Sequence, residues 1–276
     1  MVNSFFYRSV AAFFGLLLFG SVNHAQTQLP ASGPVPSLTQ TKNSAIIPRS
    51  RDDQWLKRHQ EFLGEIKTNR INLLFLGDSI TDFWRSRGSN VWNEYYAPRH
   101  AANLGINGDR TQNLLWRLQN GELDGLHPKV VILMIGTNNT GKERNKDKIR
   151  NTTSETIEGV HAVVHAVQTR LPDSRILLLG IFPRGEPGNP QRQQIQEINQ
   201  AIASLADGRR IVFLDIGGKF LSPDGRIAKD IMSDLLHPTE KGYRIWAEAM
   251  EPTLSAMLAP QKPPLHGRIV AYQTAR

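Results

Sequence analysis

Five short apolar runs recur along the chain, and a polar loop and a helical pattern follow each of them. The runs cover residues 71–76, 101–104, 130–135, 175–179 and 211–214. They do not alternate between apolar and polar residues, which is typical of strands buried on both faces of a parallel sheet. Helices are expected over residues 53–67, 112–119, 152–170, 191–206 and 241–258. This alternation predicts an α/β fold, a three-layer α/β/α sandwich around a five-stranded parallel sheet.

The two ends of the chain lack this alternation. Residues 1–25 carry one charge, Arg8, followed by an apolar run that is too short to cross a bilayer, which is the layout of a signal peptide. Residues 26–51, rich in Pro, Ser, Thr and Gln, are interpreted as a flexible linker. The predicted organisation is therefore a signal over 1–25, a linker over 26–51, one domain over 52–258 and a basic tail over 259–276. A secreted or periplasmic protein is expected, with an uncleaved N-terminal anchor as the alternative.

Charge and cysteine content exclude several classes of function. The formal net charge is +8, but the end segments contribute much of it, without acidic residues, through Arg8, Lys42, Arg49, Arg51, Lys262, Arg268 and Arg276. No basic groove for nucleic acid is therefore predicted in the domain. The chain has no cysteine, which excludes disulfides, thiolate metal sites and cysteine nucleophiles.

Three loops rich in glycine, asparagine and aspartate follow the first three predicted strands. They contain Gly77-Asp78-Ser79, Gly105-Ile106-Asn107-Gly108-Asp109 and Gly136-Thr137-Asn138-Asn139. Because ligands of open parallel sheets bind at the carboxyl ends of the strands, these loops are expected to meet at one edge. The alternative is that glycine and asparagine only make turns at strand ends. Three such loops, one of which carries a serine, favour a functional site.

Ser79, Asp234 and His237 are the residue types of a serine-hydrolase triad. A serine becomes a nucleophile only when a base takes its proton and a third group orients that base. Asp234 and His237 are three positions apart, so one helical turn can bring them together. We expect Ser79 to be the nucleophile, His237 the general base and Asp234 the group that orients the ring. The Gly-x-Ser-x-Gly elbow is absent because residue 81 is threonine.

Acyl transfer also needs hydrogen-bond donors for the developing oxyanion. The candidates are the backbone N–H groups of Ser79 and Gly105 and the side-chain amide of Asn138. This chemistry requires no cofactor, and none is predicted. His161 and His165 are spaced like metal ligands, but no glutamate accompanies them and a helix explains their spacing. No metal site is expected.

Four blocks, Gly77-Asp78-Ser79, Gly105, Gly136-x-Asn138 and Asp234-x-x-His237, resemble those of the SGNH (GDSL-type) hydrolases. Longer runs at residues 103–109, 115–123, 183–186 and 222–225 are similar to the catalytic α subunits of platelet-activating-factor acetylhydrolase. The resemblance covers residues 52–258. It implies a flavodoxin-like fold, a metal-free Ser–Asp–His triad and a short acyl pocket closed by Ile80 and Leu236. It is also compatible with a homodimer.

The function expected from these observations is an exported carboxyl-ester hydrolase that removes acetyl or other short acyl groups. A carbohydrate or similar small ester is the expected substrate, and loops such as 85–96 and 182–190 are expected to select its alcohol. One alternative is a lysophospholipase or thioesterase with a longer acyl channel. Another is a non-catalytic carbohydrate-binding module, which predicts loss of the nucleophile, the base or the oxyanion donors.

Overall fold

A computed structural model describes residues 42–68, 70–143 and 148–259 of the chain. The predicted signal peptide, residues 26–41 of the predicted linker and residues 260–276 of the predicted tail lie outside these described residues. Within them, the expected α/β fold with a five-stranded, all-parallel sheet is confirmed, in the order β2-β1-β3-β4-β5. The strands are β1 (Leu73–Gly77), β2 (Ala101–Asn103), β3 (Val130–Met134), β4 (Arg175–Leu179) and β5 (Ile211–Leu214).

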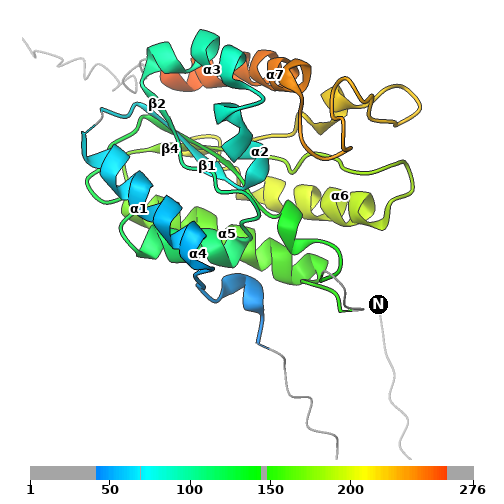
Figure 1. Ribbon diagram of the computed structural model, residues 1–276, viewed down its shortest axis with the longest axis horizontal. Coiled ribbons are helices and arrows are strands. Elements are labelled where there is room, and N and C mark those ends of the chain that lie inside the picture. Colours follow the sequence, from blue (N-terminus) through cyan, green and yellow to red (C-terminus); the bar gives the residue numbers. More distant parts are fainter. Residues whose placement is uncertain (1–41, 69, 144–147, 260–276) are drawn as a thin grey trace, which may run out of the picture. The chain divides into compact units, whose positions relative to one another are not determined.

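Helices cover both faces of the sheet (Figure 1). One face carries α1 (Asp53–Thr68), α4 (Thr111–Gln119), α5 (Thr153–Arg170) and α6 (Pro190–Ile202). The other carries α3 (Ser89–Tyr95) and α7 (Glu240–Leu258). The short helix α2 (Ser79–Asp82) begins directly after β1. No described helix has the length and apolar character that a membrane crossing requires.

The central strands are buried on both sides because alternate residues enter two different cores. In β1, Leu74 and Leu76 pack against α1, α4 and α5, whereas Leu73 and Phe75 pack on the α7 side. All five residues of β1 and all five of β3 are buried. This double burial explains why the sequence shows continuous apolar runs in place of an alternating pattern.

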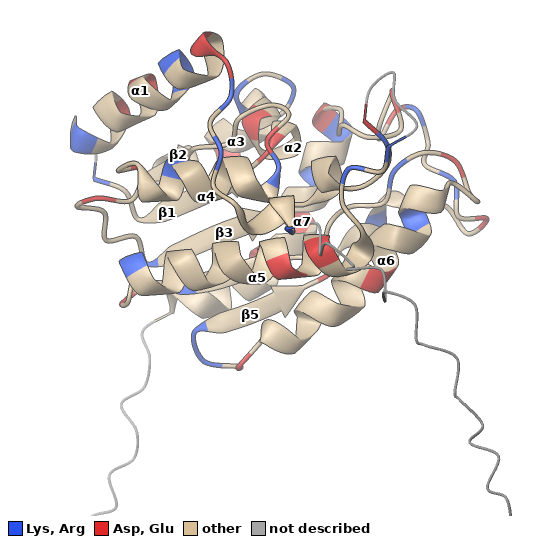
Figure 2. Cartoon of the chain, turned by 90° about the horizontal axis from the view of Figure 1, so that it is seen from below, with Lys and Arg blue, Asp and Glu red and all other residues tan. Residues whose placement is uncertain are grey.

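Local signals fix where the helices begin. At the start of α5 the side chain of Thr152 accepts a hydrogen bond from the N–H of Glu155, and the Glu155 carboxylate accepts one from the N–H of Thr152. This reciprocal arrangement satisfies two N–H groups that the helix leaves unpaired. Acidic residues lie toward the amino end of α5, where the ribbon is red in Figure 2. Arg170 lies in the last turn of the helix, and both placements suit the helix dipole.

The part of the predicted linker that is described, residues 42–51, is not a free tether. A 3-10 turn at Ser44–Ile46 lies against α4 and α5, and Ala45 is fully buried. The hydroxyl of Thr111 donates to the carbonyl of Ala45 at 2.8 Å, and the N–H of Arg49 donates to the carbonyl of Gln112 at 3.0 Å. The prediction of a linker up to residue 51 is therefore wrong. Hydrogen bonds hold this segment, and hydrophobic periodicity does not reveal such contacts.

Residues 85–96 also differ from the loop that was expected there. They contain helix α3. Its Trp92, and Tyr96 directly after it, join an aromatic cluster with Phe75 and Trp84. This segment packs against α7 and contributes to the core. Burial of its aromatic rings overrides the weak helical signal of a short polar sequence.

Candidate active site

Ser79, His237 and Asp234 lie in one hydrogen-bonded chain. The Oγ atom of Ser79 is 3.0 Å from Nε2 of His237, and Nδ1 of His237 is 2.7 Å from Oδ2 of Asp234. The serine and the histidine are 158 positions apart in the sequence, and the fold brings them together. Their geometry is that of a nucleophile, a base and a group that orients the base.

Ser79 is the first residue of α2, at the carboxyl end of β1. The Asp78 side chain caps this helix by accepting a hydrogen bond from the N–H of Ile80 at 3.0 Å. Gly77 permits the tight turn, since a Cβ atom there would lie 2.2 Å from Oγ1 of Thr81 and 2.6 Å from the carbonyl oxygen of Met134. Asp78 is fully buried, and this burial raises its pKa to about 7. The carboxyl beside the serine is therefore partly protonated near neutral pH.

The segment from Asp234 to His237 folds into a tight turn that brings the acid and the base together. Oδ1 of Asp234 accepts hydrogen bonds from the N–H groups of Leu236 (3.1 Å) and His237 (2.8 Å). Partial burial works to raise the pKa of Asp234, but hydrogen bonds from the His237 N–H and ring outweigh it and lower that pKa. Asp234 is therefore ionised at neutral pH, as a group that stabilises an imidazolium must be.

Leu235, inside this turn, has a left-handed backbone with φ of 58°. Such a conformation costs a non-glycine residue about 1 kcal/mol, so neighbouring contacts must hold it. The N–H of Gly185 donates to the Leu235 carbonyl at 2.7 Å, and the N–H of Leu235 donates to the Met232 carbonyl at 3.0 Å. The loop after β4 thus supports the turn that carries the acid and the base.

Aromatic and basic groups surround the histidine. The ring of Phe83 lies 5.0 Å from the ring of His237, and the guanidinium of Arg87 lies 5.0 Å from the Phe83 ring. Arg87 also approaches Asp234, with 3.8 Å between Nη1 and Oδ2. On the other side of α2, the hydroxyl of Tyr243 donates to the Ile80 carbonyl at 2.7 Å. This contact joins α7, which follows the histidine, to the serine helix.

The three candidate oxyanion donors surround the same edge, but two of them already have partners. The Asn138 amide donates to the Asp109 carbonyl at 3.0 Å, which leaves its second N–H for another acceptor. The N–H of Gly105 donates to Oδ1 of Asn103 at 2.9 Å. Gly105 would therefore have to share or exchange this bond to serve an oxyanion. A Cβ at Gly105 would lie 2.5 Å from the N atom of Asp82, so close packing on α2 requires glycine there.

Arg117 is a buried residue that positions this edge, and the sequence analysis assigned it no role. Its guanidinium is held between the carboxylates of Asp109 (2.9 Å) and Glu122, all three side chains being fully buried. It also donates to the carbonyls of Leu104 at 2.8 Å and Gly77 at 3.3 Å, one residue before Gly105 and two residues before Ser79. A cation inside a predicted amphipathic helix, with acids five and eight positions away, is the signal that could have identified it.

Ile80 and Leu236, the predicted walls of the acyl pocket, belong to one apolar cluster on the α7 side of the sheet. Ile80 is buried and Leu236 is half-buried against this cluster.

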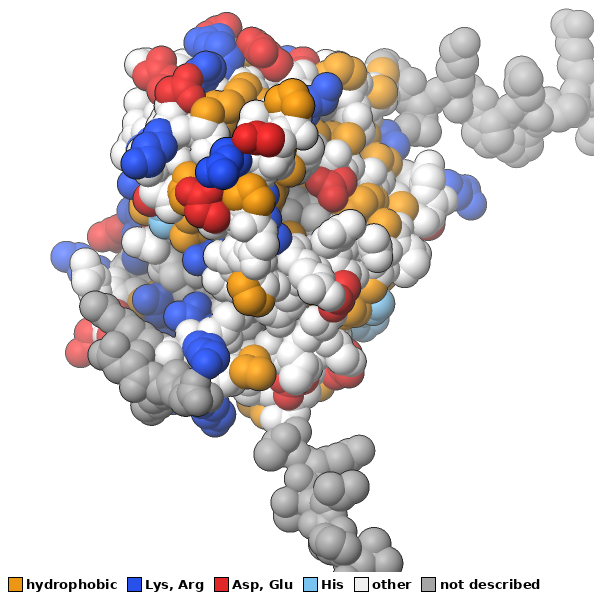
Figure 3. All heavy atoms as spheres, turned by 90° about the vertical axis from the view of Figure 1, so that its right-hand side faces the viewer, with side chains coloured by type: hydrophobic (Ala, Val, Ile, Leu, Met, Phe, Trp, Pro, Cys, Tyr) orange, Lys and Arg blue, Asp and Glu red, His pale blue; other side chains and the backbone are white. Residues whose placement is uncertain are grey.

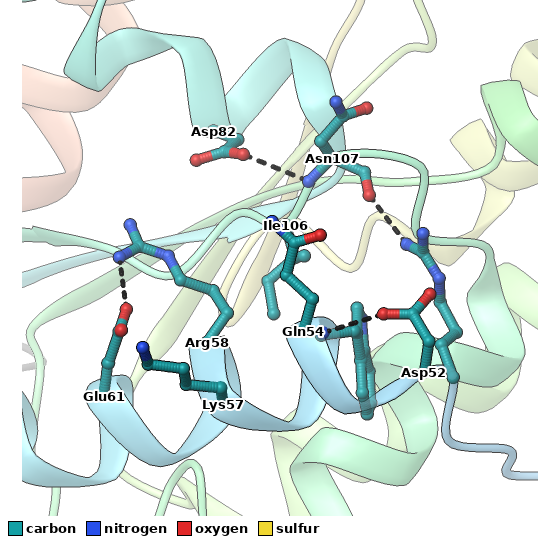
Figure 4. A pocket seen from close by; sticks show the side chains of 10 residues that line it. Asp52, Gln54, Lys57, Arg58, Glu61, Asp82, Ile106 and Asn107 are labelled. Carbon is teal, nitrogen blue, oxygen red and sulfur yellow. Dashed lines mark hydrogen bonds and ion pairs between the residues drawn. The ribbon is translucent and has the colours of Figure 1, made fainter.

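A separate polar cavity of about 440 Å³ opens beside the serine helix, between α1 and the loop after β2. Figure 4 shows it: Asp82 accepts a hydrogen bond from the N–H of Asn107 at 3.1 Å on one wall, and Arg58 pairs with Glu61 at 2.9 Å on another.

Charged side chains of both signs surround this edge of the sheet. Figure 3 looks onto the side where the loops after β4 and β5 project in Figure 1, and shows basic and acidic groups interspersed around a hollow. Among residues 42–68, 70–143 and 148–259, no group of three or more histidine, aspartate or glutamate side chains is arranged to hold a metal ion. Ser79, His237 and Asp234 are hydrogen-bonded to one another at this edge.

Comparison with known proteins gives a consistent result. Residues 75–245 match the model of the GDSL-like lipase/acylhydrolase family. Platelet-activating factor acetylhydrolase IB subunit alpha2 of Rattus norvegicus is 39% identical over 207 residues, which cover 73% of this chain and 86% of that protein.

Two solved structures share the fold. A GDSL-like lipase from Bacteroides thetaiotaomicron has a TM-score of 0.59 at 19% identity, covering 73% of this chain and 98% of its own. An acetylxylan esterase from Geobacillus stearothermophilus has a TM-score of 0.53 at 21% identity, covering 68% of this chain and 94% of its own.

Proposed function

This chain belongs to the GDSL-like lipase/acylhydrolase family of carboxylic ester hydrolases, and from that premise we propose that it is an exported esterase for short acyl groups. The observation that carries the proposal is the chain of hydrogen bonds from Ser79 through His237 to Asp234, with distances of 3.0 and 2.7 Å. An ester placed against Ser79 meets a nucleophile whose proton has an acceptor within reach.

In the proposed mechanism, Nε2 of His237 takes the proton of Ser79 as Oγ attacks the acyl carbonyl carbon. The N–H of Ser79 and the free N–H of the Asn138 amide stabilise the oxyanion, with Gly105 as a third donor if it releases Asn103. The imidazolium, held by Asp234, then protonates the leaving alkoxide. A water molecule activated by the same ring releases the acid from the acyl-enzyme.

The proposed preference for acetyl groups rests on the walls beside the nucleophile. Ile80 is buried and Leu236 packs against the same apolar cluster, and we assign these two branched side chains as the walls of the acyl pocket. The names of the similar proteins point the same way, since they include an acetylhydrolase and an acetylxylan esterase. We propose an O-acetylated carbohydrate as the substrate. It carries a short acyl group, and an exported enzyme would meet it outside the cytoplasm.

The first test is hydrolysis of p-nitrophenyl esters by the purified protein and its Ser79→Ala variant. We expect the variant to lose activity by a factor of about 10⁴ or more, because the covalent step requires the Ser79 hydroxyl. Full activity of the variant would remove Ser79 from the mechanism. Labelling of Ser79 by a phosphonate ester would contradict a non-catalytic binding module.

Acyl length is tested with the same series of esters. The small pocket predicts that kcat/KM falls from acetate to octanoate by about tenfold or more, since a longer chain meets Ile80 and Leu236. Equal rates on both esters would favour a lysophospholipase or thioesterase.

Export is tested by sequencing the N-terminus of the protein recovered from cells. A start at residue 26 supports the signal peptide, and an intact Met1 contradicts its cleavage.

A further inference from the structure

Two arginines reach the segment that carries the proposed oxyanion donor Asn138. Nη1 of Arg184 donates to the carbonyl and the hydroxyl of Thr137, at 3.3 and 3.2 Å. Nη1 of Arg150 donates to the Asn138 carbonyl at 3.1 Å. Both side chains are half-buried. All three acceptors are uncharged, so the positive charges of the two arginines are not balanced by these contacts.

Other arginines at this edge do have carboxylate partners. Arg110 forms a two-point pair with Glu143 at 2.8 and 3.1 Å, and Arg85 pairs with Asp82 at 2.9 Å. Neither Arg150 nor Arg184 lies within ion-pair distance of any carboxylate in the described part of the chain. In addition, Nε of Arg150 is buried and has no hydrogen-bond partner among the described residues. Arg192, near the start of α6, likewise donates to backbone carbonyls, those of Arg184, Gly185 and Gly225. Arg150 and Arg184 differ from it because they contact the segment that carries Asn138.

The electrostatics agree with this geometry. Burial lowers the pKa of Arg184, the charge of Arg150 lowers it further, and the carboxyl groups of Asp78 and Asp234 oppose both effects. Burial likewise lowers the pKa of Arg150 and the charge of Arg110 lowers it further, while the carboxylate of Glu143 opposes both effects. Asp234 is already held by His237, and Asp78 caps α2. Two half-buried cations that repel one another are stabilised when an anion binds between them.

We propose that Arg150 and Arg184 bind an anionic group of the ester substrate, and that this substrate is an O-acetylated saccharide bearing a carboxylate. The inference rests on the proposed function, because it places the ester at Ser79. The Thr137–Asn138 segment connects the two: Asn138 carries a proposed oxyanion donor, and the two arginines donate to oxygen atoms of the same segment. The proposal therefore places a carboxylate of the acetylated sugar beside the arginines, because guanidinium groups match carboxylates in a two-point geometry.

The test compares esters that differ in charge. The kcat/KM values of 3-acetoxybenzoate and 4-acetoxybenzoate are compared with those of their neutral methyl esters. Each value is divided by the rate constant for hydrolysis of the same ester by hydroxide, which corrects for differences between the leaving groups. We expect the native chain to favour the anionic ester by about fivefold in kcat/KM, with the preference decreasing as salt is added. Methyl glycosides of O-acetylated galacturonic acid and galactose, which differ only at C6, form the second pair. A preference confined to the aryl esters would overturn the saccharide assignment.

The variants Arg150→Gln and Arg184→Gln should each lower the ratio of anionic to neutral kcat/KM, whatever their effect on the neutral ester alone. Arg184→Lys should restore part of that ratio, because it restores the charge. The matched control is Arg209→Gln, which removes an exposed charge just before β5, at the opposite edge of the sheet. Circular dichroism verifies the fold of each variant.

Equal losses on anionic and neutral esters would overturn the proposal and assign the arginines to support of the Asn138 segment. Failure of the proposed function gives a different result. In that case the native chain hydrolyses none of these esters and Ser79→Ala changes nothing.

Discussion

At the scale of single residues, Asp78 combines a structural role with an electrostatic cost. Its side chain caps the helix that begins with Ser79, yet the carboxyl is fully buried and its pKa is raised to about 7. Between the ordinary pKa of 3.8 and about 7, the folded chain holds a proton that the unfolded chain releases. The free energy of unfolding therefore falls as the pH rises through this window, because the folded state binds more protons.

Asp78→Asn should remove this dependence, because an amide keeps the capping oxygen and stays neutral. We expect its stability relative to the native chain to increase from about pH 4.5 to about pH 7.5 by about 3 kcal/mol. Urea unfolding at both pH values measures it. Asp173→Asn, an exposed carboxylate, is the control. If Asp78→Asn lost stability with pH as the native chain does, the buried carboxyl would not be the cause.

The sequence was sufficient to identify the residues with reactive side chains. It did not identify the residues that hold the backbone near the site in place. Ser79, Asp234 and His237 were found because the proposed reaction needs their side chains, and the structure places them within hydrogen-bonding distance. Two interactions were not predicted. One is the hydrogen bond from the N–H of Gly105 to Asn103. The other is the contact of the Arg117 guanidinium with the carbonyls of Gly77 and Leu104. Both involve backbone groups, which every residue carries and which leave no pattern in a sequence.

At the scale of elements, the segment over residues 42–51 is part of the domain. Asn43 donates to the Glu155 carbonyl at 3.2 Å and to Glu158 at 2.8 Å, and Ala45 fits against Gly159, where a Cβ atom would lie 3.0 Å from that of Ala45. These contacts join the segment to α5, while Arg49 and Arg51 join it to α4 and the loop after β2. A domain boundary at residue 52 would remove all of them.

Two truncations test this boundary. The reference is the chain that starts at residue 42. A chain that starts at residue 52 should be less stable by about 2–4 kcal/mol, since it loses the burial of Ala45 and several hydrogen bonds of about 1 kcal/mol each. Equal stability of the two chains in urea would show that the contacts contribute nothing.

The strands and long helices were predictable because the two-sided burial of β1 and β3 and the apolar faces of α5 and α7 leave strong periodic signals. Helix α3 was not predictable for the opposite reason. It has seven residues, and its stability depends on aromatic contacts with residues that are distant in sequence. Short elements of this kind depend on tertiary packing more than on their own propensity.

At the scale of the whole molecule, the two cores share one five-stranded sheet and cannot separate without exposing it. Trp84 and Trp246 are buried on the α7 side, whereas Trp55 packs on the opposite side with α1 and α4. Because β1 and β3 contribute residues to both cores, loss of either core exposes the same strands.

Unfolding of the described domain should therefore occur in one step. We expect tryptophan fluorescence, which reports on both cores, and far-ultraviolet circular dichroism, which reports on the backbone, to give coincident transitions in urea. The measurement is made on the chain that starts at residue 42. Two separated transitions would indicate that the α7 side and the α1–α4–α5 side unfold independently.

The turn that carries Asp234 and His237 has one further consequence. The acid and the base lie within four residues, and the left-handed backbone at Leu235 is held by hydrogen bonds to Gly185 and Met232. If warming breaks these hydrogen bonds, Asp234 and His237 are displaced together. Ser79 stays in place at the end of β1. Activity would then be lost gradually on warming, before the sheet melts, and would return on cooling without refolding of the domain.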